Sequence, residues 1–152
     1  MLIVAAATQY RGALGRSLFL IQLMRKLMQH ASTLVVHHQG QVIERLGDGL
    51  VLRFDAVPAA VQCARALHQL AEDEGAPRPE VERLQLRAGV HCAPIWSDAS
   101  GLYGMGVSLT ARVAAMGGPG DTVLTAAARD RMVAGLDLDL QDLGMCYLKH
   151  VD

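Results

Sequence analysis

The sequence predicts a single α+β domain over its 152 residues, and three observations support this class. Apolar residues recur at helical spacing in some segments, and they alternate with polar residues in others. The predicted segments follow the order β-α-β-β-α-β, with a further α-β unit and final strands behind them. This order is the split βαβ arrangement of ferredoxin-like folds, in which helices pack on one face of a mainly antiparallel sheet.

The first half of the chain is predicted to contain a strand, a helix, a hairpin and a second helix. The strand covers residues 2–7. The apolar positions of the first helix are Leu14, Leu18, Ile21, Leu27 and Met28. This helix is apolar on more than one face, so part of it is expected to contact another subunit. The hairpin is placed over residues 33–54, and Asp55 is the expected N-cap of a second helix that ends at Gly75.

The second half is predicted to alternate between strands and helices. A strand over residues 84–96 has one apolar face, made of Leu84, Leu86, Ala88 and Val90. The remaining elements, in order, are a loop at 97–101, a helix at 107–116, a strand at 121–125, a short helix at 126–135 and a closing pair of strands at 136–144 and 146–151.

The composition of the chain argues against two classes of function, nucleic-acid binding and membrane insertion. With 51% hydrophobic and 19% charged residues the chain can bury one ordinary core. A net charge of -1 and an aromatic content of 4% do not indicate a nucleic-acid partner. No apolar run reaches the roughly 18 residues of a membrane span, and the N-terminus lacks the basic start of a signal peptide. We therefore expect a cytoplasmic protein, with Cys63, Cys92 and Cys146 as reduced thiols.

Asp48 lies in the bend between two apolar runs, flanked by Gly47 and Gly49. Turn chemistry alone explains it, because the glycines accept positive φ and an aspartate tolerates a turn. The functional alternative is a carboxylate held at a rigid hairpin tip as a ligand for Mg²⁺, which prefers oxygen ligands. The local pattern leaves both interpretations open.

Four segments in this order and spacing resemble the class III nucleotidyl cyclase homology domain, the catalytic module of adenylate and guanylate cyclases. They are "GQVIERLGDGLVLRF" with the alanine-rich helix after it, "LRAGVHCAPI", "GLYGMGVSLTARVAAMGGPGDTVLT" and "DLGMCYLKHV". The resemblance covers nearly the whole chain. It implies a head-to-tail homodimer, or a heterodimer with a related cyclase domain, whose active sites lie across the interface.

The resemblance also implies a pair of metal-binding aspartates, of which this chain keeps one. Two carboxylates in the family hold two Mg²⁺ or Mn²⁺ ions that clamp the attacking and leaving oxygens. Asp48 matches the second aspartate. Aligning Tyr10 with the aromatic residue of the family's first turn places Ala6 at the first aspartate, and no residue in "LIVAAATQYRG" is acidic. We therefore expect the metal pair to be broken and no cofactor to be needed, with Mg²⁺ or Mn²⁺ as the cofactor only if the domain is active.

Other positions of the family motif are partly retained. Ser108 stands where the family has a transition-state Asn, and Arg112 stands at the phosphate-binding Arg four residues later. Glu44 and Gly101 occupy the two base-contacting positions, and Glu44 favours GTP over ATP if either nucleotide binds. Lys149 resembles a lysine that approaches the triphosphate. For each of Arg112, Glu44 and Lys149, the alternative interpretation is an ordinary solvated or interface residue.

The adjacent pairs His37–His38 and His91–Cys92 are interpreted as structural. Neighbouring residues in a strand point to opposite faces, so neither pair can easily share one metal ion.

Two functional hypotheses follow. In the first, the domain is a signalling or dimerisation module of the cyclase fold that has lost metal-dependent catalysis. In the second, it is an active nucleotidyl cyclase, guanylate rather than adenylate, alone or as half of a heterodimer. The domain could also be one part of a longer signalling chain.

Overall fold

A computed structural model of the chain describes residues 2–10, 18–80, 83–94, 96–98, 101–103, 105–132 and 138–148. Its elements are β1 (Leu2–Tyr10), α1 (Leu18–His37), β2 (Gln41–Leu46), β3 (Gly49–Phe54), α2 (Val57–Gly75), β4 (Leu84–Cys92), β5 (Trp96–Asp98), β6 (Gly101–Tyr103), α3 (Met105–Met116), β7 (Thr122–Leu124) and α4 (Ala126–Arg129). The expected α+β class with a mainly antiparallel sheet is confirmed.

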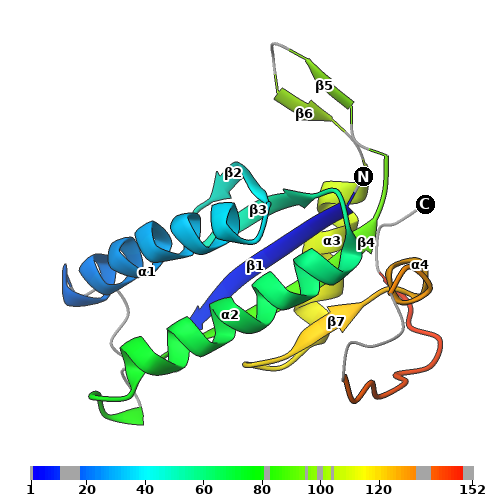
Figure 1. The fold of residues 1–152 in the computed structure, drawn as a ribbon. Helices are drawn as coiled ribbons and strands as arrows, with labels where there is room; N and C mark the ends of the chain where they lie inside the picture. Colours follow the sequence, from blue (N-terminus) through cyan, green and yellow to red (C-terminus); the bar gives the residue numbers. More distant parts are fainter. Residues whose placement is uncertain are drawn as a thin grey trace.

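The main sheet has five strands in the order β2-β3-β1-β4-β7. β1 is the middle strand of the five and pairs antiparallel with both β3 and β4, while β4 and β7 pair in parallel. The order β2-β3-β1-β4 is that of the split βαβ arrangement. β5 and β6 form a separate two-stranded hairpin that stands clear of the main sheet (Figure 1).

Helices cover both faces of the sheet. α1 and α2 lie on one face, and α3 lies on the other (Figure 1). The α1–α2 side holds the main core, where Leu52, Phe54 and Val90 are fully buried against residues of both helices. On the opposite face Val51 packs with Ile43 and with Val107 of α3. The expectation that helices cover one face therefore holds for α1 and α2 but not for α3.

β4 has the predicted alternation of buried apolar and more exposed residues in its first part. Leu84, Leu86, Ala88 and Val90 are 0–5% exposed and face the main core. β4 nevertheless ends at Cys92 rather than at Trp96, and Trp96 begins β5. Part of the predicted loop at 97–101 is instead paired in the β5–β6 hairpin, where Asp98 lies opposite Gly101.

The predicted hairpin starts too early in the sequence. Residues 33–37 are the last turn of α1, and the two strands begin at Gln41 and Gly49. Leu27, Ala31 and Val35 are buried at a spacing of four, so the core continues along one face of the helix through this β-branched stretch. His37 therefore ends a helix and His38 lies in a turn, and the strand argument made for this pair is wrong.

Two smaller predictions are also wrong. The N-cap of α2 is Ala56, which makes no side-chain cap, whereas Asp55 lies 3.7 Å from the guanidinium of Arg53. α2 ends at Gly75, as predicted. The closing strand pair is not found in residues 138–148, where the chain forms neither strand nor helix. The other residues of that pair lie outside the described parts of the chain.

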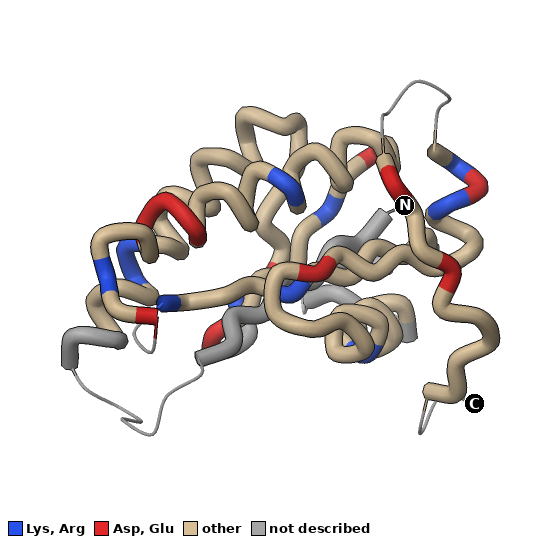
Figure 2. Tube along the Cα trace, turned by 90° about the horizontal axis from the view of Figure 1, so that it is seen from below, with Lys and Arg blue, Asp and Glu red and all other residues tan. Residues whose placement is uncertain are grey.

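Among the described residues, no helix has both the length and the apolarity that a bilayer span requires. Figure 2 shows Lys and Arg residues scattered among Asp and Glu residues along the described chain, which agrees with the absence of a basic patch in the sequence.

Candidate functional site

The candidate site is the β2–β3 turn together with the neighbouring stretch of β1. The turn consists of Gly47 and Asp48, and Gly47 has a φ of +54°, a conformation that favours glycine. Asp48 is exposed at this turn. The carboxylate thus sits at the end of a hairpin whose β3 strand is buried in the sheet, as the sequence predicts.

The strand register brings position 6 of β1 next to this turn. Ala7 pairs with Gly49, the residue directly after Asp48, and Ala6 pairs with Leu50. Neighbouring strands lie about 4.8 Å apart, so position 6 lies near the turn, although its direct partner is Leu50, two residues after Asp48. The two positions thus belong to one region of the fold.

The donor set at this place does not fit a pair of divalent ions. Asp48 supplies one carboxylate, and β1 carries no acidic residue or histidine from Leu2 to Tyr10. In the described part of the chain no three His, Cys, Asp or Glu residues are grouped so as to hold a metal ion. A hard divalent cation needs several oxygen ligands, and two such ions need shared carboxylates.

Glu44 lies at an irregularity of β2. The pairing register shifts between Val42 and Glu44, so Ile43 is an extra residue and Glu44 lies opposite Val51. Ile43 packs against Val51, whereas Glu44 is exposed. Bulges of this kind redirect side chains and are common beside functional sites. No signal in the sequence indicated the bulge.

Ser108 and Arg112 lie one turn apart on α3. Their spacing of four places them on the same side of the helix, where Ser108 is exposed and Arg112 is half-buried. Thr110 between them is fully buried and donates its hydroxyl to the carbonyl of Gly106 at 2.5 Å. Gly101 is the first residue of β6, and Lys149 lies outside the described residues.

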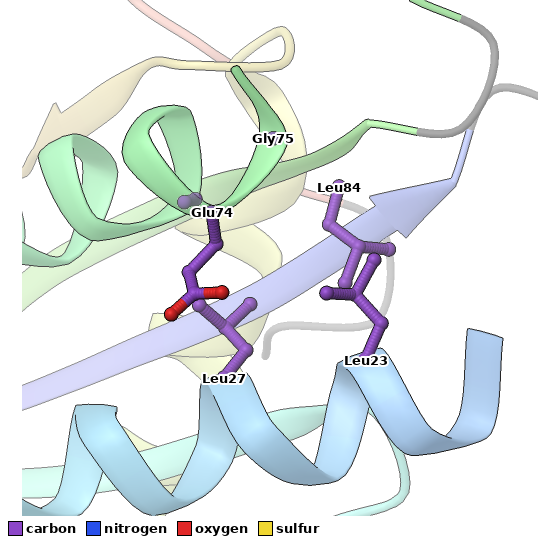
Figure 3. A pocket seen from close by; sticks show the side chains of 6 residues that line it. Leu23, Leu27, Glu74, Gly75 and Leu84 are labelled. Carbon is purple, nitrogen blue, oxygen red and sulfur yellow. The ribbon is translucent and has the colours of Figure 1, made fainter. Parts of the chain in front are cut away.

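A small hollow in the described structure lies elsewhere, between α1, α2 and the start of β4 (Figure 3). Leu23, Leu27, Ala71, Gly75 and Leu84 line it. Glu74 covers it, with its carboxylate 2.9 Å from Lys26 Nζ and 3.1 Å from His30 Nδ1. The hollow leaves no room for a small molecule, so it is a packing feature of the helix pair.

Sequence reasoning missed two histidine contacts near β7. His68 Nε2 lies 2.9 Å from Thr122 Oγ1, and His91 Nδ1 lies 3.0 Å from Thr125 Oγ1. Burial lowers the pKa of both histidines. A structural role for His91 agrees with the sequence interpretation, but the partner residues could not be found without the topology.

Comparisons with known proteins give a consistent picture. No protein-family model matches the chain. A protein named "Putative adenylate cyclase 3" from Rhizobium meliloti (strain 1021) is 32% identical over 130 residues, which are 86% of this chain and 22% of that protein. The chain spans 22% and 12% of the lengths of the two curated relatives that it matches.

Solved structures share the fold. An adenylate/guanylate cyclase/hydrolase from Silicibacter pomeroyi has a TM-score of 0.82 and 24% identity, over 99% of this chain and 90% of that one. An adenylate cyclase from Trypanosoma brucei in its monomeric state has a TM-score of 0.76 and 18% identity, over 99% and 85%. A non-canonical dimeric guanylyl cyclase domain from Blastocladiella emersonii has a TM-score of 0.67 and 13% identity, over 86% and 81%.

Proposed function

Because this chain is a cyclase-homology domain with the class III adenylate/guanylate cyclase fold, we propose that it acts as a dimerisation and signalling module without metal-dependent turnover. One observation carries the proposal: Ala6, which pairs with Leu50 two residues after Asp48, stands where the resemblance to the cyclase family puts the first aspartate.

The chemistry of nucleotide cyclisation explains why this substitution matters. Two divalent ions are needed to position the attacking hydroxyl and to neutralise the pyrophosphate that leaves, and shared carboxylates hold both ions in place. Asp48 alone supplies too little negative charge and too few ligand oxygens. Ser108 in place of an Asn removes a second group that acts in the transition state. Each such loss costs roughly 10²-fold or more in rate.

The proposed partner is a second copy of the chain or a related cyclase domain. Homologous cyclase domains include a dimeric form, which supports this choice. GTP rather than ATP is the nucleotide that the domain would bind, if it binds one, since Glu44 can accept hydrogen bonds from a guanine edge. A cytoplasmic location is part of the proposal, because Cys63, Cys92 and Cys146 are all free thiols.

A turnover assay tests the proposal directly. The purified protein is incubated with GTP or ATP and Mn²⁺, and cyclic nucleotide is measured for the wild type and for Asp48→Ala. We expect both proteins to give only the background of the protein-free control. Cyclic nucleotide that disappears in Asp48→Ala would contradict the proposal and support the second hypothesis, an active cyclase or half of one, for which Asp48, Glu44 and Arg112 are the retained groups.

A second measurement addresses the metal site without relying on turnover. Mn²⁺ binding in the presence of GTP is compared for the wild type, Ala6→Asp and Ala6→Asn by electron paramagnetic resonance. We expect Ala6→Asp to bind Mn²⁺ at least about tenfold more tightly, because it restores the second carboxylate. Ala6→Asn has nearly the same size without the charge and is the matched control. Tight Mn²⁺ binding by the wild type would argue against a broken metal pair.

A further inference from the structure

Two adjacent histidines lie where α1 ends. His37 is the last residue of the helix, and His38 lies in the turn that leads to β2. Their imidazole rings pack edge to face, with centroids 5.5 Å apart and planes at 87°. Neighbouring side chains are held on opposite faces in a strand but not at the end of a helix. The geometric objection to a metal ion shared by this pair is therefore removed.

The turn that carries the two histidines is fixed by its backbone. The N–H of Gln39 donates to the carbonyl of Val36 at 3.0 Å, and Gln39 has a φ of +61°. The N–H of Gly40 donates to the carbonyl of Val35 at 2.8 Å. These two bonds form a Schellman motif, the common way in which a helix ends. Gly40 also lies against the buried ring of Phe54, where an added Cβ would collide with the ring. The histidines thus stand on a rigid support.

The ring nitrogens of these two histidines are unused within the described part of the chain. His30, His68 and His91 each have a ring nitrogen bonded to a carboxylate or to a threonine hydroxyl. For His37 and His38 the contact between the two rings is the only side-chain interaction with a described residue. His37 is exposed and His38 is half-buried, so an ion can reach both from solvent.

The separation of the rings suits a shared ion. An imidazole nitrogen binds Zn²⁺ at about 2.0–2.1 Å, which puts the ring centroid roughly 3.2 Å from the metal. Two such rings at a tetrahedral angle have centroids about 5.2 Å apart, close to the 5.5 Å observed. Rotation about χ2, which has a broad energy profile in histidine, turns a nitrogen of each ring toward the common point.

The local electrostatics favour a cation. The C-terminus of α1 carries the negative end of the helix dipole and carbonyl groups without helical partners. No Lys, Arg, Asp or Glu occurs in residues 34–43, so no side chain of this segment repels a metal ion or competes for the imidazoles. The same segment offers no carboxylate to a hard ion such as Mg²⁺.

We propose that His37 and His38 form a binding site for Zn²⁺ or a similar divalent transition-metal ion, each through one ring nitrogen. Imidazole nitrogen is a ligand that such ions prefer. No group of three potential ligands occurs among the described residues, so water fills the remaining positions. The site is separate from the Asp48 turn, and it exists whether or not the domain turns over nucleotide. A bound ion joins the last turn of α1 to the connection before β2.

Calorimetric titration with Zn²⁺ at pH 7.5 tests the proposal. Every protein carries Cys146→Ser, because an exposed thiol is itself a zinc ligand. We expect the parent to bind one Zn²⁺ per chain, with no competition from excess Mg²⁺. His37→Gln and His38→Gln should each weaken binding at least about tenfold, since even groups outside the ligand set change metal affinity by about 10- to 100-fold. His30→Gln, an exposed histidine of the same helix, is the matched control and should bind like the parent.

Histidine ring resonances of the unaltered protein give a measurement that needs no variant. In nuclear magnetic resonance spectra, Zn²⁺ should shift the resonances of His37 and His38 together, at lower concentrations than those of His30. A shift of only one of the two would overturn the proposal. Absence of binding at about 1 mM Zn²⁺ would also overturn it, as would undiminished affinity in the double variant His37→Gln/His38→Gln.

Discussion

At Gly89 the sheet and α3 approach so closely that only a hydrogen atom fits between them. A Cβ added at this position would lie 2.6 Å from the backbone N of Ala114 and 2.6 Å from the backbone O of Thr110. Both atoms belong to a helical backbone and cannot rotate away. The glycine thus sets the distance between α3 and the centre of the sheet.

Replacing this glycine should therefore be costly. We predict that Gly89→Ala lowers the free energy of unfolding by about 1–3 kcal/mol, because α3 must shift away from β4. Urea denaturation followed by circular dichroism measures the change. Gly118→Ala is the control, since its added Cβ would meet only the carboxylate oxygen of Asp121, at 3.3 Å. Equal stabilities for the two variants would show that α3 moves freely.

Individual side chains differ in how far the sequence alone could place them. The buried face of β4 follows from alternation, because a half-exposed strand needs apolar residues at every second position. Asp48 in its turn follows from the flanking glycines. Asp55 was predicted to be the N-cap of α2 because aspartate favours that position. In the structure Asp55 pairs with Arg53 instead, and the N-cap is Ala56, one residue later. The partners of His68 and His91 are 54 and 34 positions away, beyond any local pattern.

At the scale of elements, one acidic residue of α2 and two basic residues of α1 link the two helices. Glu74 of α2 projects toward α1 above Leu27, as Figure 3 shows, and it is paired with Lys26 and His30. The hydrogen bond from Lys26 is the main cause of the lowered pKa of Glu74. Lys26 is more than half exposed, so water and salt screen much of this interaction.

This arrangement predicts a pH-dependent contribution to stability. Because the folded state lowers the pKa of Glu74 below its ordinary value of 4.5, the contribution is present above pH 4.5 and is lost as pH falls through the lowered pKa. We expect Glu74→Gln to lower the free energy of unfolding by up to about 1 kcal/mol at pH 7 and to have no effect near pH 2. Thermal unfolding at the two pH values measures this. Asp73→Asn, an exposed acid bonded to Gln69, is the control, and an equal loss in both variants would contradict the prediction.

Element boundaries were the least predictable part of the fold. The residues Thr33–Val36 favour a strand locally, yet they continue α1 because Val35 completes the buried row that begins with Leu23. The closing strand pair was expected from alternating leucines in residues 136–144. Alternation shows which side chains could share a face, but a strand also needs a neighbouring strand, and residues 138–148 pair with none in the described part of the chain.

For the whole molecule, the proposed dimer predicts concentration-dependent association. Sedimentation velocity over a range of protein concentrations should show a monomer converting to a dimer. A strict monomer at every concentration would contradict the dimerisation part of the proposed function and leave the turnover prediction unaffected, so the two parts can fail separately.

Tryptophan fluorescence offers a second way to follow association. The only tryptophan of the chain, Trp96, lies in the β5–β6 hairpin, which stands away from the rest of the molecule in Figure 1.

At this scale the sequence predicted the topology well, because the order of elements and the split βαβ rules leave few arrangements. It did not predict that α3 covers the second face. That placement requires a glycine at position 89, because a larger residue would collide with the backbone of α3 at Ala114. In the sequence this contact is visible only as a glycine within a strand.

The central position of β1 has a consequence for how the chain is made. β1 leaves the ribosome before both of its partners, because β3 begins only at Gly49 and β4 only at Leu84, so both edges of an apolar strand stay open until those strands are made. Open strand edges of this kind are sites of aggregation, which chaperones counteract. Lengthening the loops between β1 and its partners should therefore lower the yield of native protein more than it lowers the stability of the finished fold.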